Sequence, residues 1–478
     1  MIQKFSRRAV VAALLGSATT GAFAEAPLTS LRPTGRPAKA GEITPEMRRS
    51  LPDVIAASGV TGRVGVVLAD ADTGEIIDAH DADIGLPPAS VTKAVTALYA
   101  IEGLGADYRF LTRVFADGPV VDGVLDGNLI LVGGGNPNLV TDDLADLAQS
   151  LKDSGLLEVR GKFFVYDSAL ANLDEIDASQ LDHLGYNPAV TGLNLNFNRV
   201  HFEWKRSGGA YTVTMDARSE LHRPVVTVAK MRIVDREVPV YTYRDGGGLD
   251  EWTVARGALG SGGARWLPVR KPGLYAADVF QTFARSHGIV LKSPKRSTRT
   301  PKARALVTHT SAPLSKILRD MLKFSTNLTA EVVGLTATRK RGGRATSLKA
   351  SANEMSRWAN KALSMGNASF ADHSGLSDAS KVSAQGMLNA MLVARRRAGF
   401  AELLKPIAMR DAKRKVIKNH PIKVNAKTGT LNFVSALSGY MTAPDGKQLA
   451  FAMICADTKR RRTLKGSEKE APKGGRAW

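Results

Sequence analysis

The strongest constraint on the fold is a β-pattern close to the end of the 478-residue chain. Apolar or small residues alternate with polar ones over 424–428, which is the two-residue period of a strand. Residues 434–441 and 448–455 predict two more strands, and Ala443-Pro444-Asp445-Gly446 predicts the turn between them. These three strands predict an antiparallel meander.

A second β-pattern lies near the other end of the chain. Residues 63–69 and 75–79 are rich in β-formers and are separated by the turn sequence Asp72-Thr73-Gly74. If this hairpin joins the meander, the sheet has five antiparallel strands. We therefore expect an α/β (α+β) fold, with a five-stranded antiparallel sheet flanked by helices.

The segment over 105–300 has a different sequence pattern, which predicts short strands that alternate with glycine turns. One helix is expected over 144–151. Strands are expected over 129–132, 160–166, 211–215, 225–228 and 238–243. The segment predicts one or two inserted β-rich domains. Its Gly133-Gly134-Gly135 run lacks the spacing of a phosphate-binding loop.

Four further segments predict either helices or irregular structure. Residues 45–58 predict a helix that Pro52 kinks or splits. Residues 314–322 have helical periodicity and predict a second helix. Residues 406–419 are basic and predict irregular structure. From Thr458 onward the tail predicts disorder.

Residues 1–24 have the order of a cleaved signal peptide. A basic start is followed by a short apolar core over 9–15 and by the small-x-small sequence Ala22-Phe23-Ala24. The expected destination is a bacterial periplasm. Arg7-Arg8 also suits twin-arginine export, but the residues that follow match that route only in part, so both export routes stay open.

Composition narrows the class of partner. The chain is 44% hydrophobic and 23% charged, which is ordinary for globular domains, and it holds no 18-residue apolar run that predicts a membrane span. Its net charge of +21 favours polyanions. An exported protein rarely meets nucleic acid, so we expect no nucleic-acid partner. An anionic cell wall or acidic lipid headgroups fit better, as a peripheral attraction.

Cysteine and histidine usage limits the chemistry. Cys455 is the only cysteine, so no intrachain disulfide can form, and it is expected to pack as a small hydrophobe. The eight histidines show no metal-ligand spacing. We therefore expect no metal and no cofactor.

The first candidate for catalysis is Ser90. It follows Pro87-Pro88 at the start of a helix that the near-helical spacing of apolar residues over 91–104 predicts, and Lys93 lies one turn further on. Residues three apart share a helix face, so the hydroxyl and the amine can meet. A serine hydroxyl becomes a good nucleophile when a neighbour takes its proton. Ser-x-x-Lys is nevertheless a loose pattern that occurs often by chance.

Two later motifs strengthen this candidate. Ser325-Thr326-Asn327 lies at a predicted helix start, where the serine could also be only a cap. Lys427-Thr428-Gly429 lies on the first strand of the meander, and Thr430 follows it. The order Ser-x-x-Lys, Ser-x-Asn, Lys-Thr-Gly is the motif set of β-lactamases and penicillin-binding proteins.

On these motifs the chain resembles the D-alanyl-D-alanine carboxypeptidases/endopeptidases of the penicillin-binding protein 4 type. The long segment between Lys93 and Ser325 agrees with that family's large insertion, and the likeness extends over roughly 45 to 456. Further stretches agree with the family: 133–139, 186–188, 193–198, 325–331 and 372–377. Three features depart from it, namely Thr326, His373 and the absence of a clear C-terminal helix pattern.

The resemblance implies a transpeptidase-like domain that the insertion divides. The implied domains are the signal peptide 1–24, the first part of the transpeptidase-like domain over 25–104, two nested β-rich domains within 105–300, the second part over 301–457, and a basic tail over 458–478.

The resemblance also implies roles. Ser90 is the nucleophile, Lys93 the base, Ser325 the proton relay, and Asn327 orients Lys93 and the substrate. Peptidoglycan stem peptides are the implied substrates and β-lactam antibiotics the implied inhibitors.

The family's substrate-binding motif carries over to the strand residues. The resemblance implies that Lys427 and Thr428 bind the substrate carboxylate, that Gly429 admits the substrate, and that the Thr430 amide joins the oxyanion hole. A β-lactamase shares all three motifs, and a peptidoglycan-binding protein without activity could keep the fold. The large insertion disfavours the first alternative and the intact motif set disfavours the second.

Overall fold

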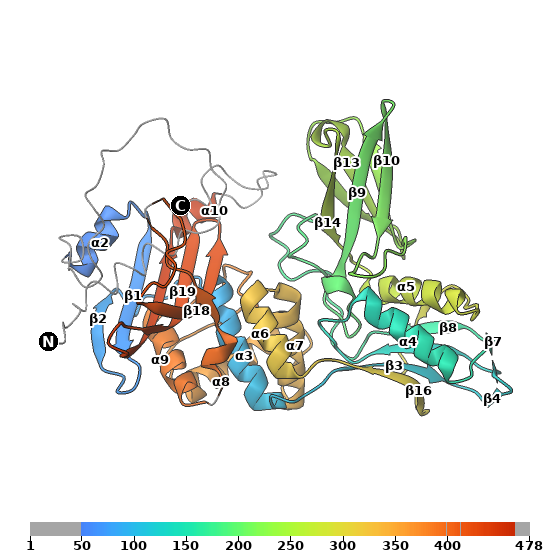
Figure 1. Ribbon diagram of the computed structural model, residues 1–478, viewed down its shortest axis with the longest axis horizontal. Coiled ribbons are helices and arrows are strands. Elements are labelled where there is room, and N and C mark those ends of the chain that lie inside the picture. Colours follow the sequence, from blue (N-terminus) through green and yellow to red (C-terminus); the bar gives the residue numbers. More distant parts are fainter. Residues whose placement is uncertain (1–48, 398, 412, 464–478) are drawn as a thin grey trace. The chain divides into compact units, whose positions relative to one another are not determined.

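A computed structural model describes residues 49–397, 399–411 and 413–463. The predicted signal peptide and the last residues of the tail lie outside this range. The described chain divides into two compact units (Figure 1). The first contains residues 49–99, 318–325 and 352–463, and the second contains residues 100–317 and 326–351.

The first unit is built on a mixed-length antiparallel sheet whose strand order is β17-β18-β19-β20-β1-β2. The strands are β17 (Lys405–Ile407), β18 (Lys423–Leu431), β19 (Val434–Thr442), β20 (Gln448–Ala456), β1 (Arg63–Asp70) and β2 (Ile76–His80). The predicted hairpin and meander do join, through β1 and β20. The expected count of five strands was one too low, because β17 pairs with β18 at the edge. Two of its three residues fall in the segment over 406–419 that was predicted to be irregular.

The two faces of this sheet carry different residues. One face holds an apolar cluster that includes Val66, Ala426 and Phe451, and Leu51 of α2 (Leu51–Ala57) packs on it. The opposite face is covered by α9 (Ala384–Arg395) and by the 3-10 turn η2 (Ala89–Val91). Side chains alternate along a strand, so the residues between the apolar ones point towards η2.

Two helices at the ends of this unit differ from prediction. Pro52 does not split α2 but lies in its first turn, where its missing N–H has no helical partner to lose, and Ser50 caps the helix. Thr458 does not begin a disordered tail. It begins the short helix α10 (Thr458–Arg462), which Asp457 caps by accepting a hydrogen bond from Arg460 N at 2.9 Å.

The remaining helices near the motifs are α3 (Thr92–Leu104), α6 (Leu314–Phe324), α7 (Asn327–Lys340) and α8 (Leu348–Ala362). The predicted periodic helices correspond to α3 and α6. Gly105, with φ of 88°, follows the last residue of α3, where a left-handed residue is the usual end of a helix. The boundary between the two units falls within α3, α6 and α8.

The second unit has a five-stranded sheet and three three-stranded sheets. The smallest of these consists of β4 (Val120–Val121), β5 (Val124–Leu125) and β7 (Glu158–Val159). The main sheet has the order β15-β8-β6-β3-β16, and helices α4 and α5 pack on each other and against it. Its elements are β3 (Leu111–Ala116), β6 (Leu129–Gly133), α4 (Thr141–Asp153), β8 (Phe163–Tyr166), α5 (Pro272–Ser286), β15 (Lys295–Arg296) and β16 (Ala305–Thr310).

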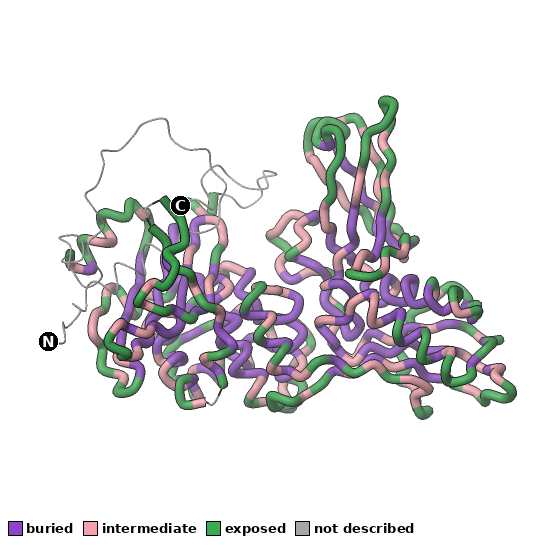
Figure 2. Tube along the Cα trace, viewed as in Figure 1, coloured by how far each residue is buried: buried purple, intermediate pink, exposed green. Residues whose placement is uncertain are grey.

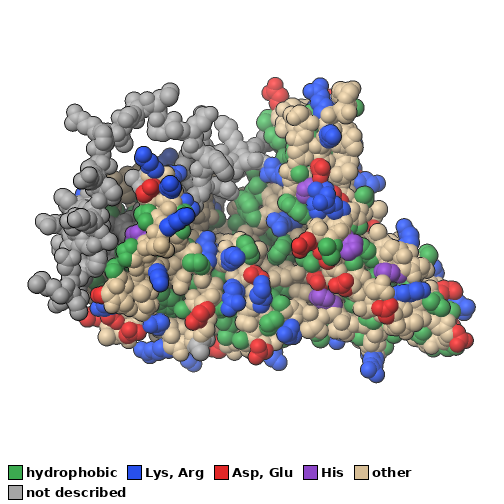
Figure 3. Space-filling view, viewed as in Figure 1, with side chains coloured by type: hydrophobic (Ala, Val, Ile, Leu, Met, Phe, Trp, Pro, Cys, Tyr) green, Lys and Arg blue, Asp and Glu red, His purple; other side chains and the backbone are tan. Residues whose placement is uncertain are grey.

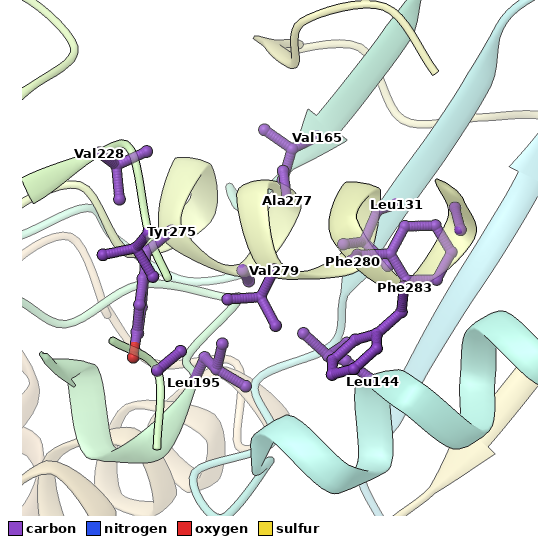
Figure 4. Close-up of a cluster of buried hydrophobic side chains, with 14 of the residues drawn as sticks. Leu131, Leu144, Val165, Leu195, Val228, Tyr275, Ala277, Val279, Phe280 and Phe283 are labelled. Atoms are coloured by element: carbon purple, nitrogen blue, oxygen red, sulfur yellow. The ribbon is translucent and has the colours of Figure 1, made fainter. Parts of the chain in front are cut away.

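Helix α5 was not predicted. Its buried residues, among them Tyr275, Phe280 and Phe283, form the core of this unit together with residues such as Leu131 and Leu144 (Figure 4). The buried residues run without a break over 275–280, so most faces of this part of the helix are covered. The sequence did not predict this helix, because the glycines on its flanks favour turns.

The other two three-stranded sheets are β10-β9-β14 and β11-β13-β12. Their strands are β9 (Arg199–Ser207), β10 (Ala210–Asp216), β11 (Ala229–Val234), β12 (Tyr241–Asp245), β13 (Asp250–Ala255) and β14 (Gly262–Pro268). The outer ends of β9 and β10 are exposed (Figure 2). The expected strand over 225–228 is wrong, since only Val225 forms an isolated bridge, with Asp216.

Glycines 133 and 134 have a packing role. A Cβ at Gly133 would lie 2.4 Å from the carbonyl oxygen of Gly192, and one at Gly134 would lie 2.4 Å from that of Leu111. Both distances are shorter than any real contact, so the glycines allow neighbouring backbones to meet.

Candidate active site

Ser90 lies in η2, directly before α3, and its side chain meets the first turn of that helix. Lys93 Nζ donates a hydrogen bond to Ser90 Oγ at 2.9 Å and another to the carbonyl oxygen of Ser374 at 2.7 Å. Lys93 is fully buried. A buried amine in contact with a serine hydroxyl is a suitable arrangement for activating a nucleophile.

The backbone around the two serines is strained. Ala89, immediately before Ser90, has φ of 47°, and Ser325 has φ of 59°. Both lie in the left-handed region that residues with a side chain rarely occupy. Such positions persist only where the surrounding structure holds them, and they gather at functional sites.

A loop at 372–377 packs against this strained turn. Gly375 has φ of 75°, and a Cβ there would lie 1.9 Å from the carbonyl oxygen of Ala89. The Asp372 carboxylate accepts hydrogen bonds from Gly375 N at 2.5 Å and from Ser377 N at 2.7 Å. Asp372 therefore shapes the loop whose Ser374 carbonyl meets Lys93.

His373 fixes the same loop through its contacts with α3 and α8. Its carbonyl accepts a hydrogen bond from Thr96 Oγ1 at 2.6 Å, its Nδ1 lies 3.3 Å from Met355 Sδ, and its ring stacks on Tyr99. The residue is fully buried, and burial lowers the pKa of its imidazole to about 3. His373 is thus neutral at pH 7.

Lys427 reaches the site from β18. It lies one residue after Ala426, which belongs to the apolar cluster, so its side chain points to the opposite face of the sheet. Its Nζ donates to Ser325 Oγ at 3.0 Å and to the carbonyl oxygen of Thr428 at 2.6 Å. Ser325 lies between α6 and α7, and Thr326 rather than Ser325 occupies the cap position of α7.

The charge of Lys427 is unfavourable where it lies. The residue is 1% exposed. Burial lowers the pKa of Lys427 well below its ordinary value, and the positive charges of Lys93 and Lys405 lower it further. The influence of Lys93 on this pKa also means that the two amines belong to one electrostatic site.

The strand meets the nucleophile at Gly429. A Cβ at this position would lie 2.9 Å from Ser90 N and 2.9 Å from the carbonyl oxygen of Pro88, so only glycine leaves the two backbones their present separation. Thr430, the next residue, is exposed and pairs with Ser435 of β19, while Thr428 is partly buried and pairs with Leu437. The first unit thus brings together Ser90, Lys93, Ser325 and 427–430.

Asn327 is described with the second unit, as the first residue of α7. Its Nδ2 donates to the carbonyl oxygen of Tyr186 at 2.9 Å. Asn187, the next residue, is fully buried and accepts hydrogen bonds from Ile176 N at 3.0 Å and Asp177 N at 2.9 Å. The amide of Asn327 is therefore attached to an ordered loop.

Arg270 holds this loop in place. Its buried guanidinium donates to the carbonyl oxygens of Asp174 at 2.7 Å, Asn187 at 2.9 Å and Asp182 at 3.0 Å. Sequence reasoning missed Arg270, Ser374 and Asp372. The sequence marks 372–377 only as a stretch that agrees with the family. Arg270 gives no sequence signal, because its partners, three backbone carbonyls and the Glu175 carboxylate at 3.7 Å, are far away in the chain.

No group of three or more His, Cys, Asp or Glu side chains among the described residues could hold a metal ion. No helix within the described ranges is long and apolar enough to cross a membrane.

Two known proteins are similar to this chain in sequence. A D-alanyl-D-alanine carboxypeptidase from Actinomadura sp. (strain R39) is 28% identical over 443 residues, covering 86% of this chain and 80% of the relative. The D-alanyl-D-alanine carboxypeptidase DacB of Haemophilus influenzae is 25% identical over 412 residues, covering 82% of this chain and 85% of the relative.

The fold is also that of a solved structure. The crystal structure of penicillin binding protein 4 (dacB) from Haemophilus influenzae superposes with a TM-score of 0.69 at 23% identity, covering 82% of this chain and 90% of that chain. The sequence family described as D-Ala-D-Ala carboxypeptidase 3 (S13) matches residues 48–471. The chain therefore belongs to the S13 family of D-Ala-D-Ala carboxypeptidases, which are serine peptidases.

Proposed function

We propose that this peptidase cleaves the D-Ala-D-Ala bond of peptidoglycan stem peptides, or the related bond of a cross-bridge, through an acyl-enzyme on Ser90. The observation that carries the proposal is the 2.9 Å contact between Lys93 Nζ and Ser90 Oγ in a buried site that also holds Lys427 and Ser325. A serine hydroxyl, a buried amine and a second hydroxyl supply a nucleophile, a base and a proton relay.

Acylation begins at Lys93. Repulsion between the Lys93 and Lys427 ammonium groups is mutual, and burial weakens solvation of both, so loss of a proton from the pair is favoured. A neutral Lys93 then accepts the Ser90 proton as Oγ attacks the carbonyl carbon. The new Oγ–C bond forms and the C–N bond breaks.

The departing amine needs a proton. Ser325 can pass to it the proton that Lys93 took from Ser90, because a hydroxyl both donates and accepts, so Lys93 and Ser325 end the step in their starting protonation states. The Oγ of Ser325 already accepts a hydrogen bond from Lys427 Nζ at 3.0 Å. Lys427 and Thr428 bind the terminal carboxylate of the substrate. Asn327, whose Nδ2 is engaged by Tyr186, offers its amide oxygen to the substrate backbone and to Lys93.

The negative oxygen of the tetrahedral intermediate is stabilised by the backbone amides of Ser90 and Thr430. Gly429 supports this role, since it lets β18 approach Ser90 N closely. Loss of one such donor costs about 3 kcal/mol of transition-state stabilisation. Water then hydrolyses the acyl-enzyme, whereas a β-lactam leaves a slowly hydrolysed acyl group.

The first test is labelling with a fluorescent penicillin. Ser90→Ala should abolish covalent labelling, because the acyl group has no oxygen to join. Ser207→Ala, which changes an exposed serine at the end of β9, is the matched control and should label like the unmodified protein. Covalent labelling that persists in the Ser90→Ala protein would remove Ser90 from the mechanism.

The second test concerns the base. Arginine stays protonated in proteins, so Lys93→Arg keeps the positive charge but cannot accept a proton. Acylation by penicillin should fall by at least about a hundredfold, the usual contribution of general base catalysis. Near-normal acylation of this variant would exclude a neutral Lys93 as the base.

A separate measurement distinguishes a β-lactamase. If the unmodified protein turns over nitrocefin within milliseconds, the β-lactamase alternative is favoured.

We also place the enzyme in the bacterial periplasm, after removal of residues 1–24. Both curated relatives are bacterial carboxypeptidases, and the basic, apolar and small-residue order of the N-terminus supports export. The net charge of +21 supports a peripheral attraction to anionic surfaces. Lys and Arg side chains are scattered over the face in Figure 3, interleaved with acidic ones.

A further inference from the structure

The segment between β17 and β18 carries a dense group of cations. Over 410–418, five residues are basic and one is acidic. All five basic residues are exposed, namely Arg410, Lys413, Arg414, Lys415 and Lys418. We call the described residues 410–411 and 413–418 the basic turn. A surface this rich in one sign of charge attracts an anionic partner.

Hydrogen bonds within the basic turn fix its backbone. The Asp411 carboxylate accepts hydrogen bonds from Lys413 N and from Lys415 N, both at 2.9 Å. Arg414 N donates to the carbonyl oxygen of Asp411 at 2.8 Å, and Arg414 has a left-handed φ of 63°. An aspartate that binds nearby backbone N–H groups is a common way to hold a tight turn. The acidic side chain of the turn thus serves the backbone, and the cations project from a fixed support.

The base of the basic turn is attached to the core of the first unit. Ile417 N donates to the carbonyl oxygen of Met409 at 2.9 Å, and Val416 forms an antiparallel bridge with Arg410. Met409 is buried in the apolar cluster on the sheet. The prediction of irregular structure over 406–419 is therefore wrong for this part, because its backbone pairs with itself in an antiparallel turn.

Two apolar side chains lie among these cations. Val416 is 44% exposed and Ile417 is 39% exposed. Lys415 precedes the pair and Lys418 follows it. Single exposed apolar residues are common on proteins, but adjacent ones within a cluster of like charges indicate a contact surface. The basic turn therefore offers both positive charge and apolar area to a partner.

A second exposed apolar pair has different neighbours. Val120 and Val121 of β4 are 42% and 64% exposed. Asp117, Asp122 and Asp126 lie close to them in the sequence, so acidic rather than basic residues accompany this pair. Of the two pairs, the one in the basic turn is the one that combines apolar area with positive charge.

The choice of partner follows from this combination. Residues 464–478 hold four basic and two acidic residues, and residues 25–48 hold four basic and three acidic ones, so neither segment supplies negative charge. A symmetric contact between two copies of this chain would place the same cations against one another. A soluble polyanion would pair with the cations but leave the apolar pair in water. An anionic lipid surface accommodates both.

We propose that the basic turn binds the surface of an anionic phospholipid bilayer. The ammonium groups of its lysines meet the lipid phosphates, while Val416 and Ile417 enter the boundary between the headgroups and the acyl chains. This inference goes beyond the proposed function and holds whether or not Ser90 is acylated. It assigns the peripheral attraction to anionic surfaces to one defined part of the first unit.

The first experiment measures sedimentation of the protein, without residues 1–24, with lipid vesicles. Vesicles of phosphatidylglycerol and phosphatidylcholine in equal amounts should bind it, and vesicles of phosphatidylcholine alone should bind it far more weakly. Each lysine near an anionic surface contributes about fivefold to the affinity. Changing Lys413, Lys415 and Lys418 together to Gln should therefore weaken binding to the mixed vesicles by about a hundredfold.

The control for net charge removes three other cations. Arg299, Lys302 and Arg304 are exposed residues of the second unit, and changing them together to Gln lowers the net charge by the same amount. This variant should bind the mixed vesicles like the unmodified protein. An equal loss in both triple variants would show that the net charge acts rather than the basic turn, and would overturn the inference.

The second experiment separates a lipid surface from a soluble polyanion. Val416→Ser together with Ile417→Ser should weaken binding to the mixed vesicles by about tenfold, because two partly exposed apolar side chains no longer leave water. Binding to inorganic polyphosphate should not change. Val120→Ser together with Val121→Ser is the matched control and should bind the vesicles normally.

Two further outcomes would overturn the inference. Equal binding to the two kinds of vesicle would exclude recognition of anionic lipid. Full vesicle binding by the Val416→Ser, Ile417→Ser variant, together with loss of polyphosphate binding in the lysine variant, would make the turn a site for a soluble polyanion.

A measurement on the unmodified protein does not depend on how any variant folds. Binding to the mixed vesicles should weaken as the salt concentration rises, since salt screens exposed charges. Affinity that stays constant with salt would contradict the inference. Urea unfolding and labelling with a fluorescent penicillin should be the same in all variants. If the unmodified protein binds the vesicles but does not react with penicillin, the proposed function fails and this inference stands.

Discussion

At the scale of single residues, the candidate site depends on ionisable groups held away from water. Lys93 and Lys427 are buried amines in one site, and His373 is a buried imidazole behind them. Burial changes how each group exchanges protons with the solvent, and this couples the pH to the stability of the fold.

Lys427 should make the protein more stable as the pH rises. Its pKa is lowered in the folded protein, so the unfolded chain binds more protons between that lowered value and about 10.4, the pKa of a free lysine. The free energy of unfolding therefore increases with pH across this window. Lys427→Met should remove that increase, as measured by urea unfolding at several pH values.

Lys423→Met, on the same strand, is the control for loss of one positive charge, because Lys423 is exposed. An identical pH slope in the Lys427→Met protein and in the unmodified one would contradict the assigned cause.

His373 should make the protein sensitive to acid. Its folded pKa of about 3 lies below the 6.5 of a free histidine, so the unfolded chain binds the extra proton between these values. Stability is then fully present above pH 6.5 and is lost as the pH falls, by up to about 1.4 kcal/mol per pH unit. His373→Phe keeps a ring against Tyr99 and should flatten this slope in thermal unfolding between pH 4 and 6.5.

At the scale of elements, the loop over 174–187 depends on an arginine at the start of a helix in another part of its unit. Arg270 precedes α5 and donates to three carbonyls of this loop. The loop in turn carries the Tyr186 carbonyl that meets Asn327. A change at Arg270 should therefore reach the Ser-x-Asn motif without touching it.

We expect Arg270→Lys to loosen this loop, because an ammonium cannot span three carbonyls as a guanidinium does. Hydrogen exchange over 174–187 should become faster, and acylation by penicillin should slow by about tenfold, the effect of one lost charged hydrogen bond. Arg256→Lys, at an exposed ion pair with Asp235, is the matched control. Unchanged exchange in the Arg270→Lys protein would mean that the loop holds itself.

Sequence reasoning recovered the elements whose patterns are local. The period of two over 424–428 and the spacing of 91–104 predicted β18 and α3, because both patterns are set by neighbouring residues. It missed β17, which is short and exists through pairing with β18, and α5, whose flanking glycines suggested turns. Pro52 was misjudged because its effect depends on its position within the helix.

The site residues divide in the same way. Ser90, Ser325 and Lys427 could be selected because three motifs occur in a fixed order, and the first unit brings these three together. Their chemical roles stay predictions. Arg270 could not be found, because its partners, three backbone carbonyls and the Glu175 carboxylate, come next to it only once the chain is folded.

At the scale of the whole molecule, the domain boundaries predicted at 25–104, 105–300 and 301–457 stay a proposal. The family match over 48–471 covers most of the chain. The predicted leader precedes that match, and its removal can be tested separately from activity.

We expect the exported protein to begin at Glu25. The small residues Ala22 and Ala24 suit a signal peptidase, so Ala22→Leu together with Ala24→Leu should block processing. N-terminal sequencing of protein from the periplasmic fraction tests this, with Ala18→Leu as a control in the same leader. A mature protein that still begins with Met1 would contradict the predicted cleavage.

The pairing of β1 with β20 has a consequence for biosynthesis. β1 is translated early, and in the sheet it lies between β2 and β20, which ends at Ala456. The edge of β1 that pairs with β20 therefore stays open until nearly all of this sequence has been translated. The contact between Lys427 and Ser325 also forms late, because Lys427 lies on β18 and is translated about a hundred residues after Ser325. A product truncated by a nonsense codon before 448 would lack β20, expose two strand edges to aggregation, and leave the serine without its finished surroundings.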